Sequence, residues 1–287
     1  IKEKQIDVVY ITLPHFSLLE FVAEIKAHSC VPVILDMRDP FSFNFYVKQE
    51  TNAEYIEKVR TLERSTFSLA DAIMNVTMNI HAEYCALYPE WKDKFHYMPN
   101  GFDNDDYPRD IEDVNQLPNA NLTLCYTGSY SSMASILPYR DAIKDVYHKH
   151  RLKIRLNLLT PTAKKRVQRD FWELNRLGLL DYHGFMKHKD AIAYQLKSHV
   201  MLFPALPTEG YFSGKIYEYI RSNRPVLCAI DTMKDSHELI LQAGVGIFAN
   251  VNEEAGLVKA LLKLHQQWQD GALRVTPNLE FIQSFSC

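Results

Sequence analysis

The sequence predicts an α/β protein built from two doubly wound parallel sheets, and three observations lead to this prediction. Short apolar runs that end at proline, aspartate or glycine are typical of buried parallel strands. Between them lie longer stretches in which apolar residues recur every three or four positions, as in helices that cover a sheet. The alternation is interrupted once, by the polar residues 103–120, which we interpret as a linker between two units.

In the first half of the chain, the hydrophobic pattern predicts four strands connected by three helices. We expect strands at residues 6–13, 31–35, 72–76 and 95–98, and helices at about residues 17–28, 52–69 and 79–87. In the first of these helices, Leu18, Phe21, Val22 and Ile25 form one apolar stripe. The first domain is therefore residues 1–120, with the linker at its end.

The second half, residues 121–287, repeats the pattern and forms the second domain. We expect strands at residues 122–126, 154–159, near 182, 200–203, 226–230 and 246–249, and helices at about residues 138–150, 164–177, 189–196, 215–221, 236–243 and 255–268. Ligands of doubly wound sheets bind beyond the carboxyl ends of the strands, so the loops after strands are where site residues are expected. A cleft is expected between the two domains.

The amino-acid composition indicates which classes of protein this chain can belong to. Hydrophobic residues make up 47% of the chain and charged residues 23%, with a formal net charge of -3, which indicates a globular protein and gives no reason to expect nucleic acid. Five dispersed cysteines without a C-x-x-C pair argue against a disulfide framework or a zinc site and fit the cytoplasm. No apolar run of about 18 residues and no signal peptide is present. The basic residues between 149 and 155 fit a solvated surface, with a peripheral membrane patch as the alternative.

The most informative segment begins at Ser213. This residue is expected to cap a helix that Gly214 and Lys215 open, and the free amides, the helix dipole and the ammonium group could then hold a diphosphate. Glu218 follows Lys215 by three residues, and its carboxylate could accept both hydroxyls of a ribose. A capped surface helix with one salt bridge explains the same residues equally well.

Residues 213–227, which read Ser-Gly-Lys-Ile-Tyr-Glu-Tyr and end in Arg-Pro-Val-Leu, resemble the donor-binding helix of the family 4 (group 1) glycosyltransferases. Four other segments are similar to motifs of that family and occur in the same order: residues 36–40, 99–103, 126–128 and 182–185. The resemblance therefore extends over nearly the whole chain.

The resemblance implies a GT-B fold, in which two Rossmann-like domains face a cleft. It also implies a hexosyltransferase that moves a sugar, with retention of configuration, from a nucleotide-diphosphate sugar to a saccharide or lipid-linked acceptor in polysaccharide biosynthesis. No metal and no cofactor would take part. The donor would lie on the second domain, where Glu218 binds the ribose. The diphosphate would face Lys215, the loop of Gly128 and Ser129, and the helix start at Ser213 and Gly214.

One position departs from the family pattern. The glutamate that contacts the donor sugar is expected eight residues before Glu218, where this chain has Gly210, so Glu209 is the candidate after a one-residue shift. We therefore take Glu209, Lys215 and His15 as candidate catalytic residues, although a loop histidine without a role is an equal interpretation of His15.

The acceptor is expected on the first domain. Its candidate contacts are Asp36, Arg38 and Asp39, with an internal ion-pair network as the alternative. Because GT-B first domains usually have six or seven strands, the four predicted here lead us to expect a truncated first domain whose sheet has an uncovered edge or face. The final crossover helix is also expected to be absent.

Two other functions remain open from the sequence. One is a nucleotide-sugar epimerase of the same two-domain shape, which would require an acid/base set in the cleft. The other is a non-catalytic module that binds a nucleotide sugar without turnover.

Overall fold

The computed structural model describes residues 4–13, 15–44, 47, 50–118, 120–131, 134–205, 213–233, 235–253 and 255–287. The chain divides into two compact α/β units, Ile1–Asn100 and Gly101–Cys287, each with its own parallel sheet. No helix in these described ranges is long and apolar enough to cross a membrane.

The first unit has four parallel strands in the order β1-β2-β3-β4. The strands are β1 (Val9–Leu13), β2 (Val33–Met37), β3 (Ala72–Asn75) and β4 (Phe95–Tyr97), and the helices are α1 (Glu20–His28), α3 (Ala53–Leu69) and α4 (Met78–Leu87). Short 3-10 helices precede α1 at Phe16–Leu19 and follow α4 at Pro89–Lys94. The predicted strands and helices are thus confirmed to within a few residues.

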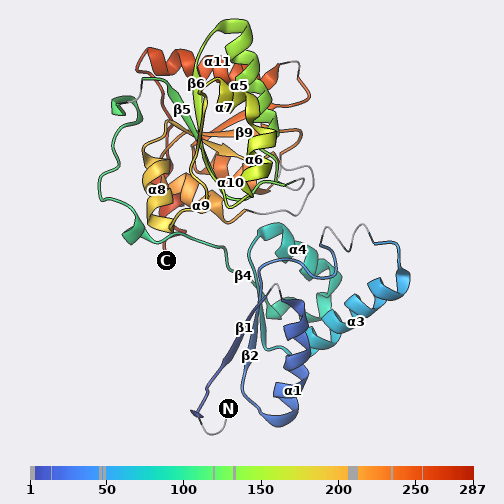
Figure 1. Cartoon of the computed structure of the whole chain (residues 1–287). Coiled ribbons are helices and arrows are strands. Elements are labelled where there is room, and N and C mark those ends of the chain that lie inside the picture. The colour runs from blue at the N-terminus through green and yellow to red at the C-terminus, as the bar shows by residue number, and fades with distance from the viewer. Residues whose placement is uncertain are drawn as a thin grey trace. The chain divides into compact units, whose positions relative to one another are not determined.

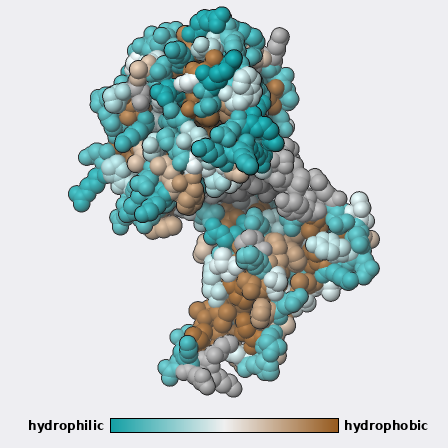
Figure 2. Space-filling model, in the orientation of Figure 1, coloured by the Kyte–Doolittle hydropathy of each residue, from teal (hydrophilic) through white to brown (hydrophobic). Residues whose placement is uncertain are grey.

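All strand connections in the first unit run in one direction. Since crossovers between parallel strands are right-handed, consecutive strands in spatial order place their helices on one face of the sheet, and Figure 1 shows α1, α3 and α4 on the same side. The opposite face carries exposed apolar side chains, among them Val8 at 47% exposure and Tyr10 at 49%. Figure 2 shows the resulting apolar surface on the first unit. An uncovered edge or face of this sheet was expected from the small number of predicted strands.

The second unit has six parallel strands in the order β10-β9-β8-β5-β6-β7, so it is wound in both directions from the central strand β5. The strands are β5 (Leu122–Thr127), β6 (Ile154–Leu159), β7 (Leu180–Tyr182), β8 (Val200–Phe203), β9 (Val226–Ile230) and β10 (Gly246–Asn250). The helices are α5 (Leu137–His150), α6 (Lys164–Asp170), α7 (Trp172–Arg176), α8 (His188–Leu196), α9 (Lys215–Arg221), α10 (Asp235–Gln242), α11 (Gly256–Gln269) and α12 (Leu279–Gln283).

Three features of the second unit differ from the sequence interpretation. The single helix expected at residues 164–177 is two helices, because Phe171 between them has non-helical dihedral angles and a fully buried side chain. Helix α12 was not predicted. The expected linker, residues 103–120, contributes Tyr107, Val114 and Leu117 to the cores of this unit.

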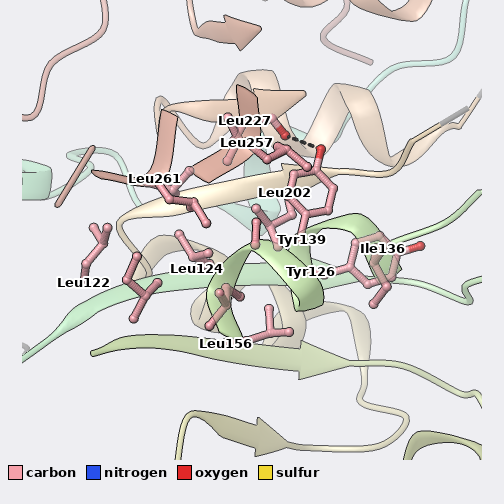
Figure 3. Close-up of a cluster of buried hydrophobic side chains, with 14 of the residues drawn as sticks. Leu122, Leu124, Tyr126, Ile136, Tyr139, Leu156, Leu202, Leu227, Leu257 and Leu261 are labelled. Carbon is pink, nitrogen blue, oxygen red and sulfur yellow. Dashed lines mark hydrogen bonds between the residues drawn. The ribbon is translucent and has the colours of Figure 1, made fainter. Parts of the chain in front are cut away.

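A tyrosine crosslinks the core of the second unit. Tyr139 of α5 is fully buried, and Figure 3 shows its hydroxyl directed at the carbonyl oxygen of Leu227, 3.0 Å away. The same hydroxyl accepts a hydrogen bond from the amide of Ala229 at 2.6 Å. These bonds tie α5 to β9, and the ring belongs to the same apolar cluster as leucines from β5, β6 and α11. The sheet that carries the candidate site is therefore fixed to its covering helix by polar as well as apolar contacts.

A buried histidine connects two strands of this sheet. The Nδ1 atom of His199 accepts a hydrogen bond from the amide of Thr123 at 3.0 Å, so the ring is held in its neutral form. Burial, with a smaller contribution from the positive charge of Arg224, lowers the pKa of His199 to about 4. The ring therefore stays uncharged in the folded protein at pH values where an unfolded histidine takes up a proton.

We expect this histidine to make the second unit less stable in acid. Between pH 7 and pH 5 the unfolded chain binds the proton and the folded chain does not, so stability should fall by about 2 kcal/mol from this residue alone. The variant His199→Asn, whose side-chain oxygen can replace Nδ1 as acceptor, should lose that part of the pH dependence. Urea unfolding at pH 7 and pH 5 measures it, and equal pH slopes in the two proteins would contradict the assignment.

Candidate functional site

The carboxyl end of the central strand β5 opens into a sharp turn. Gly128 follows the strand with φ +124°, a conformation that residues with a side chain rarely adopt, and its amide donates to the carbonyl of Leu159 at 2.9 Å. The carbonyl of Ser129 accepts a hydrogen bond from the Tyr126 hydroxyl at 2.6 Å. The turn predicted as a phosphate-facing loop thus lies at the carboxyl edge of the sheet, anchored to its neighbours.

Helix α9 begins at Lys215, with Gly214 as its N-cap residue. No side chain caps this helix end, so the expectation that the Ser213 hydroxyl does so is wrong; instead the Ser213 carbonyl accepts from the amide of Ile216 at 3.1 Å. The Lys215 ammonium lies 2.9 Å from Oε1 of Glu218, one turn later. Helix α9 therefore presents an ammonium and a carboxylate side by side at its first turn.

The carboxylate of Glu218 is held from the other side by a residue that sequence reasoning missed. Gln195 of α8 is fully buried and donates from Nε2 to Oε2 of Glu218 at 2.8 Å and to Oγ1 of Thr127 at 3.4 Å. Thr127, the last residue of β5, also donates its amide to the Tyr219 hydroxyl at 2.9 Å. These bonds join the end of β5, α8 and α9, so the structure brings Glu218 and the turn at Gly128 to one place.

A second polar group borders Glu218. The Nε2 atom of His188 lies 3.0 Å from a carboxylate oxygen of Asp106, and its Nδ1 atom lies 3.8 Å from Oε1 of Glu218. The Tyr107 hydroxyl donates to the main-chain carbonyl of Glu218 at 3.3 Å. Asp106 and Tyr107 lie in the segment that the sequence predicts as a linker, and their acidic and aromatic side chains gave no signal of this role.

The three acceptor-side candidates and the candidate catalytic residue His15 lie in the first unit, at the carboxyl ends of its strands. Asp36 and Arg38 are 3.9 Å apart, and Arg38 donates to the side-chain oxygen of Asn100 at 2.5 Å. Asp39 is exposed next to them, and His15 is exposed after β1, the strand that pairs with β2. The structure thus places all four candidates at one edge of this sheet, with Asp36 and Arg38 in an ion pair.

Glu209, the candidate for the donor-sugar contact, lies outside the described residues. Gln195 could not be found from the sequence, since a glutamine within a helix has no pattern that distinguishes a buried bridge from a surface residue. Within the described parts of the chain, no group of three histidine, cysteine or acidic side chains is arranged to hold a metal ion.

Comparison with known proteins defines the fold. No protein-family model and no curated protein matches this chain. Its structure has the two-unit GT-B architecture found in glycosyltransferases, as the sequence predicts. Sucrose-phosphate synthase from Thermosynechococcus elongatus is similar with a TM-score of 0.72 at 13% identity, over 97% of this chain and 69% of that chain.

Two other solved structures, of HepE and of WaaG, are also similar to this chain. HepE of Anabaena, solved in complex with UDP-glucose, has a TM-score of 0.68 at 14% identity, over 96% of this chain and 74% of that chain. WaaG, a glycosyltransferase involved in lipopolysaccharide biosynthesis, has a TM-score of 0.61 at 16% identity, over 87% of this chain and 74% of that chain. At these identities the likeness establishes the fold.

Proposed function

We propose that this chain is a retaining glycosyltransferase that takes a hexosyl group from a UDP-sugar and passes it to a hydroxyl group of a saccharide or lipid-linked acceptor. The observation that carries the proposal is the nearly buried carboxylate of Glu218, held between Gln195 and Lys215 beside the turn at Gly128. The fold shared with HepE, which was solved with UDP-glucose, supports a uridine nucleotide as the donor.

The site chemistry matches a nucleoside diphosphate. Among the residues that the structure describes, each carboxylate oxygen of Glu218 has one hydrogen-bonding partner, Lys215 or Gln195, which leaves a second lone pair on each for the two vicinal hydroxyls of a ribose. The Lys215 ammonium would turn from the Glu218 carboxylate toward the diphosphate, because the diphosphate carries the larger negative charge. The turn at Gly128 would let the main chain approach the same phosphates, because glycine has no Cβ.

The proposed reaction exchanges one bond at the anomeric carbon. The bond to the diphosphate oxygen breaks, the acceptor oxygen bonds to the same face of the sugar, and the acceptor proton leaves with the diphosphate. Lys215 would stabilise the charge that develops on the leaving group. Glu209 would contact the donor sugar, and a donor complex should show its carboxylate within hydrogen-bonding distance of a sugar hydroxyl. Asp36, Arg38 and Asp39 would contact the acceptor, and His15 would be a further catalytic residue.

We also propose that the reaction takes place in the cytoplasm without a metal ion or cofactor, so that activity should continue in EDTA. The basic residues 149–155 support a solvated surface rather than a membrane patch. Lys149 pairs with Asp145 at 2.7 Å, and Arg155 pairs with Asp181 at 2.5 Å.

A panel of nucleotide sugars, read out by release of the nucleoside diphosphate, tests the proposal. A UDP-sugar should be consumed slowly alone and faster when saccharide acceptors are added, and calorimetry should show binding of UDP. Epimerised free nucleotide sugar in the absence of an acceptor would instead indicate an epimerase. Binding of UDP without any turnover would indicate a non-catalytic module, and no binding would reject the proposal altogether.

A further inference from the structure

The first unit contains a cavity that none of the predicted site residues lines. Its volume is about 680 Å³, in the range of pockets that hold small organic ligands. It lies between α3, the end of α4 and the segment after β2. Phe43 belongs to that segment, Arg60 and Arg64 come from α3, and Leu87 comes from α4. The cavity is thus built by one unit alone.

A buried carboxylate fixes the wall of this cavity. Glu63 has no exposed surface and accepts hydrogen bonds from the amide and hydroxyl of Ser42, at 3.0 and 2.5 Å, and from the hydroxyls of Tyr84 and Tyr88, at 3.0 and 2.6 Å. Ser42 and Tyr88 both line the cavity. Tyr88 is buried, and its ring is stacked on Trp91 with 5.6 Å between the ring centroids, so its position is fixed by core packing as well as by Glu63. The wall is therefore formed before any ligand arrives.

Charged groups of both signs line the same cavity. Three are carboxylates, from Glu50, Glu57 and Glu83, and two are guanidinium groups, from Arg60 and Arg64. Arg64 lies 5.4 Å from the centre of the Tyr88 ring and is held by an ion pair with a glutamate on the protein surface. Arg60, one turn earlier on α3, forms no ion pair with any residue that the structure describes.

We propose that this cavity binds a neutral saccharide. An anionic ligand would meet three carboxylates and a cationic ligand two guanidinium groups, whereas sugar hydroxyls both donate to carboxylates and accept from guanidinium groups. The ring of Phe43 and the exposed side chain of Leu87 provide apolar surface for the carbon-bound hydrogens of a pyranose. The role of this site rests on the proposed transferase function. Given that function, the cavity holds a sugar unit of the acceptor that does not itself react.

A glycan array carrying neutral and anionic oligosaccharides tests this proposal with the intact chain. The tryptophan of Thr61→Trp would fill the cavity from α3, and Lys58→Trp places the same side chain elsewhere on that helix as the matched control. We expect binding to neutral glycans, at least a tenfold loss in Thr61→Trp and in Arg60→Ala, and no change in Lys58→Trp. Circular dichroism melting curves establish that each variant is folded.

Three outcomes would overturn the proposal: no neutral glycan bound, equal binding by Thr61→Trp, or a preference for anionic glycans. UDP binding, measured on the same samples, separates the two proposals because it belongs to the second unit. Glycan binding without UDP binding would retain the saccharide site and reject the transferase. UDP binding without glycan binding would reject the saccharide site alone.

Discussion

Replacing Glu218 with alanine is expected to weaken the binding of UDP by about 1–3 kcal/mol, which is roughly a 5- to 150-fold rise in Kd. The carboxylate is the one group at the first turn of α9 that can accept both ribose hydroxyls, and its position is set by Gln195 on one side and Lys215 on the other. Alanine removes the acceptor and leaves the buried amide of Gln195 without its shorter hydrogen bond. Calorimetric titration with UDP measures the effect.

A control substitution distinguishes a loss of UDP binding at the site from unfolding of the protein. Glu238 is an exposed glutamate of α10 in the same unit, so Glu238→Ala should leave the affinity unchanged. The affinity of the isosteric Glu218→Gln for UDP should lie between those of Glu218→Ala and Glu238→Ala, because its side chain keeps one acceptor oxygen. If Glu218→Ala binds UDP as tightly as the parent while remaining folded, the ribose assignment is wrong.

Replacing Glu63 with alanine is expected to destabilise the first unit by about 3–5 kcal/mol. The substitution leaves the two tyrosine hydroxyls and the Ser42 amide without their common acceptor inside the core, and each unsatisfied buried donor costs about 1–3 kcal/mol unless it finds water. Burial raises the pKa of Glu63 and the four hydrogen bonds oppose that rise, so the network offsets part of the cost of burying this carboxyl group.

The measurement can be confined to the first unit. Trp91 is the one tryptophan in residues 1–100, so in a Trp172→Phe/Trp268→Phe background its fluorescence reports the unfolding of this unit. Glu57→Ala, an exposed change on the same helix, is the control and should shift the urea midpoint little. A loss below about 1 kcal/mol in Glu63→Ala would show that the network is not a main source of stability.

The strands could be predicted well because each is a short apolar run between turn residues. Both sheets are parallel and packed against helices, the first on one face only, so hydrophobic periodicity carries most of the signal. The break at Phe171 was missed because a buried phenylalanine fits a continuous helix as well as a junction between two helices.

The polar groups were harder to predict, since their roles depend on partners far along the chain. Glu63 and Gln195 have the composition of ordinary helix surface residues, yet both are fully buried. Glu63 meets Ser42 and Tyr88, and Gln195 meets Glu218, only after the chain has folded. Lys215 and Glu218 could be predicted as a pair because both lie on one helical turn.

The order of strands also has a consequence for biosynthesis. In the first unit every strand pairs with the next one in the chain, so its sheet can grow by one strand as each emerges from the ribosome. In the second unit β5 pairs with β8. Leu124 of β5 therefore cannot reach its partner Val200 until β8 has been translated. Contacts between distant residues slow folding. The N-terminal unit is therefore expected to fold cotranslationally, ahead of the unit that carries Glu218.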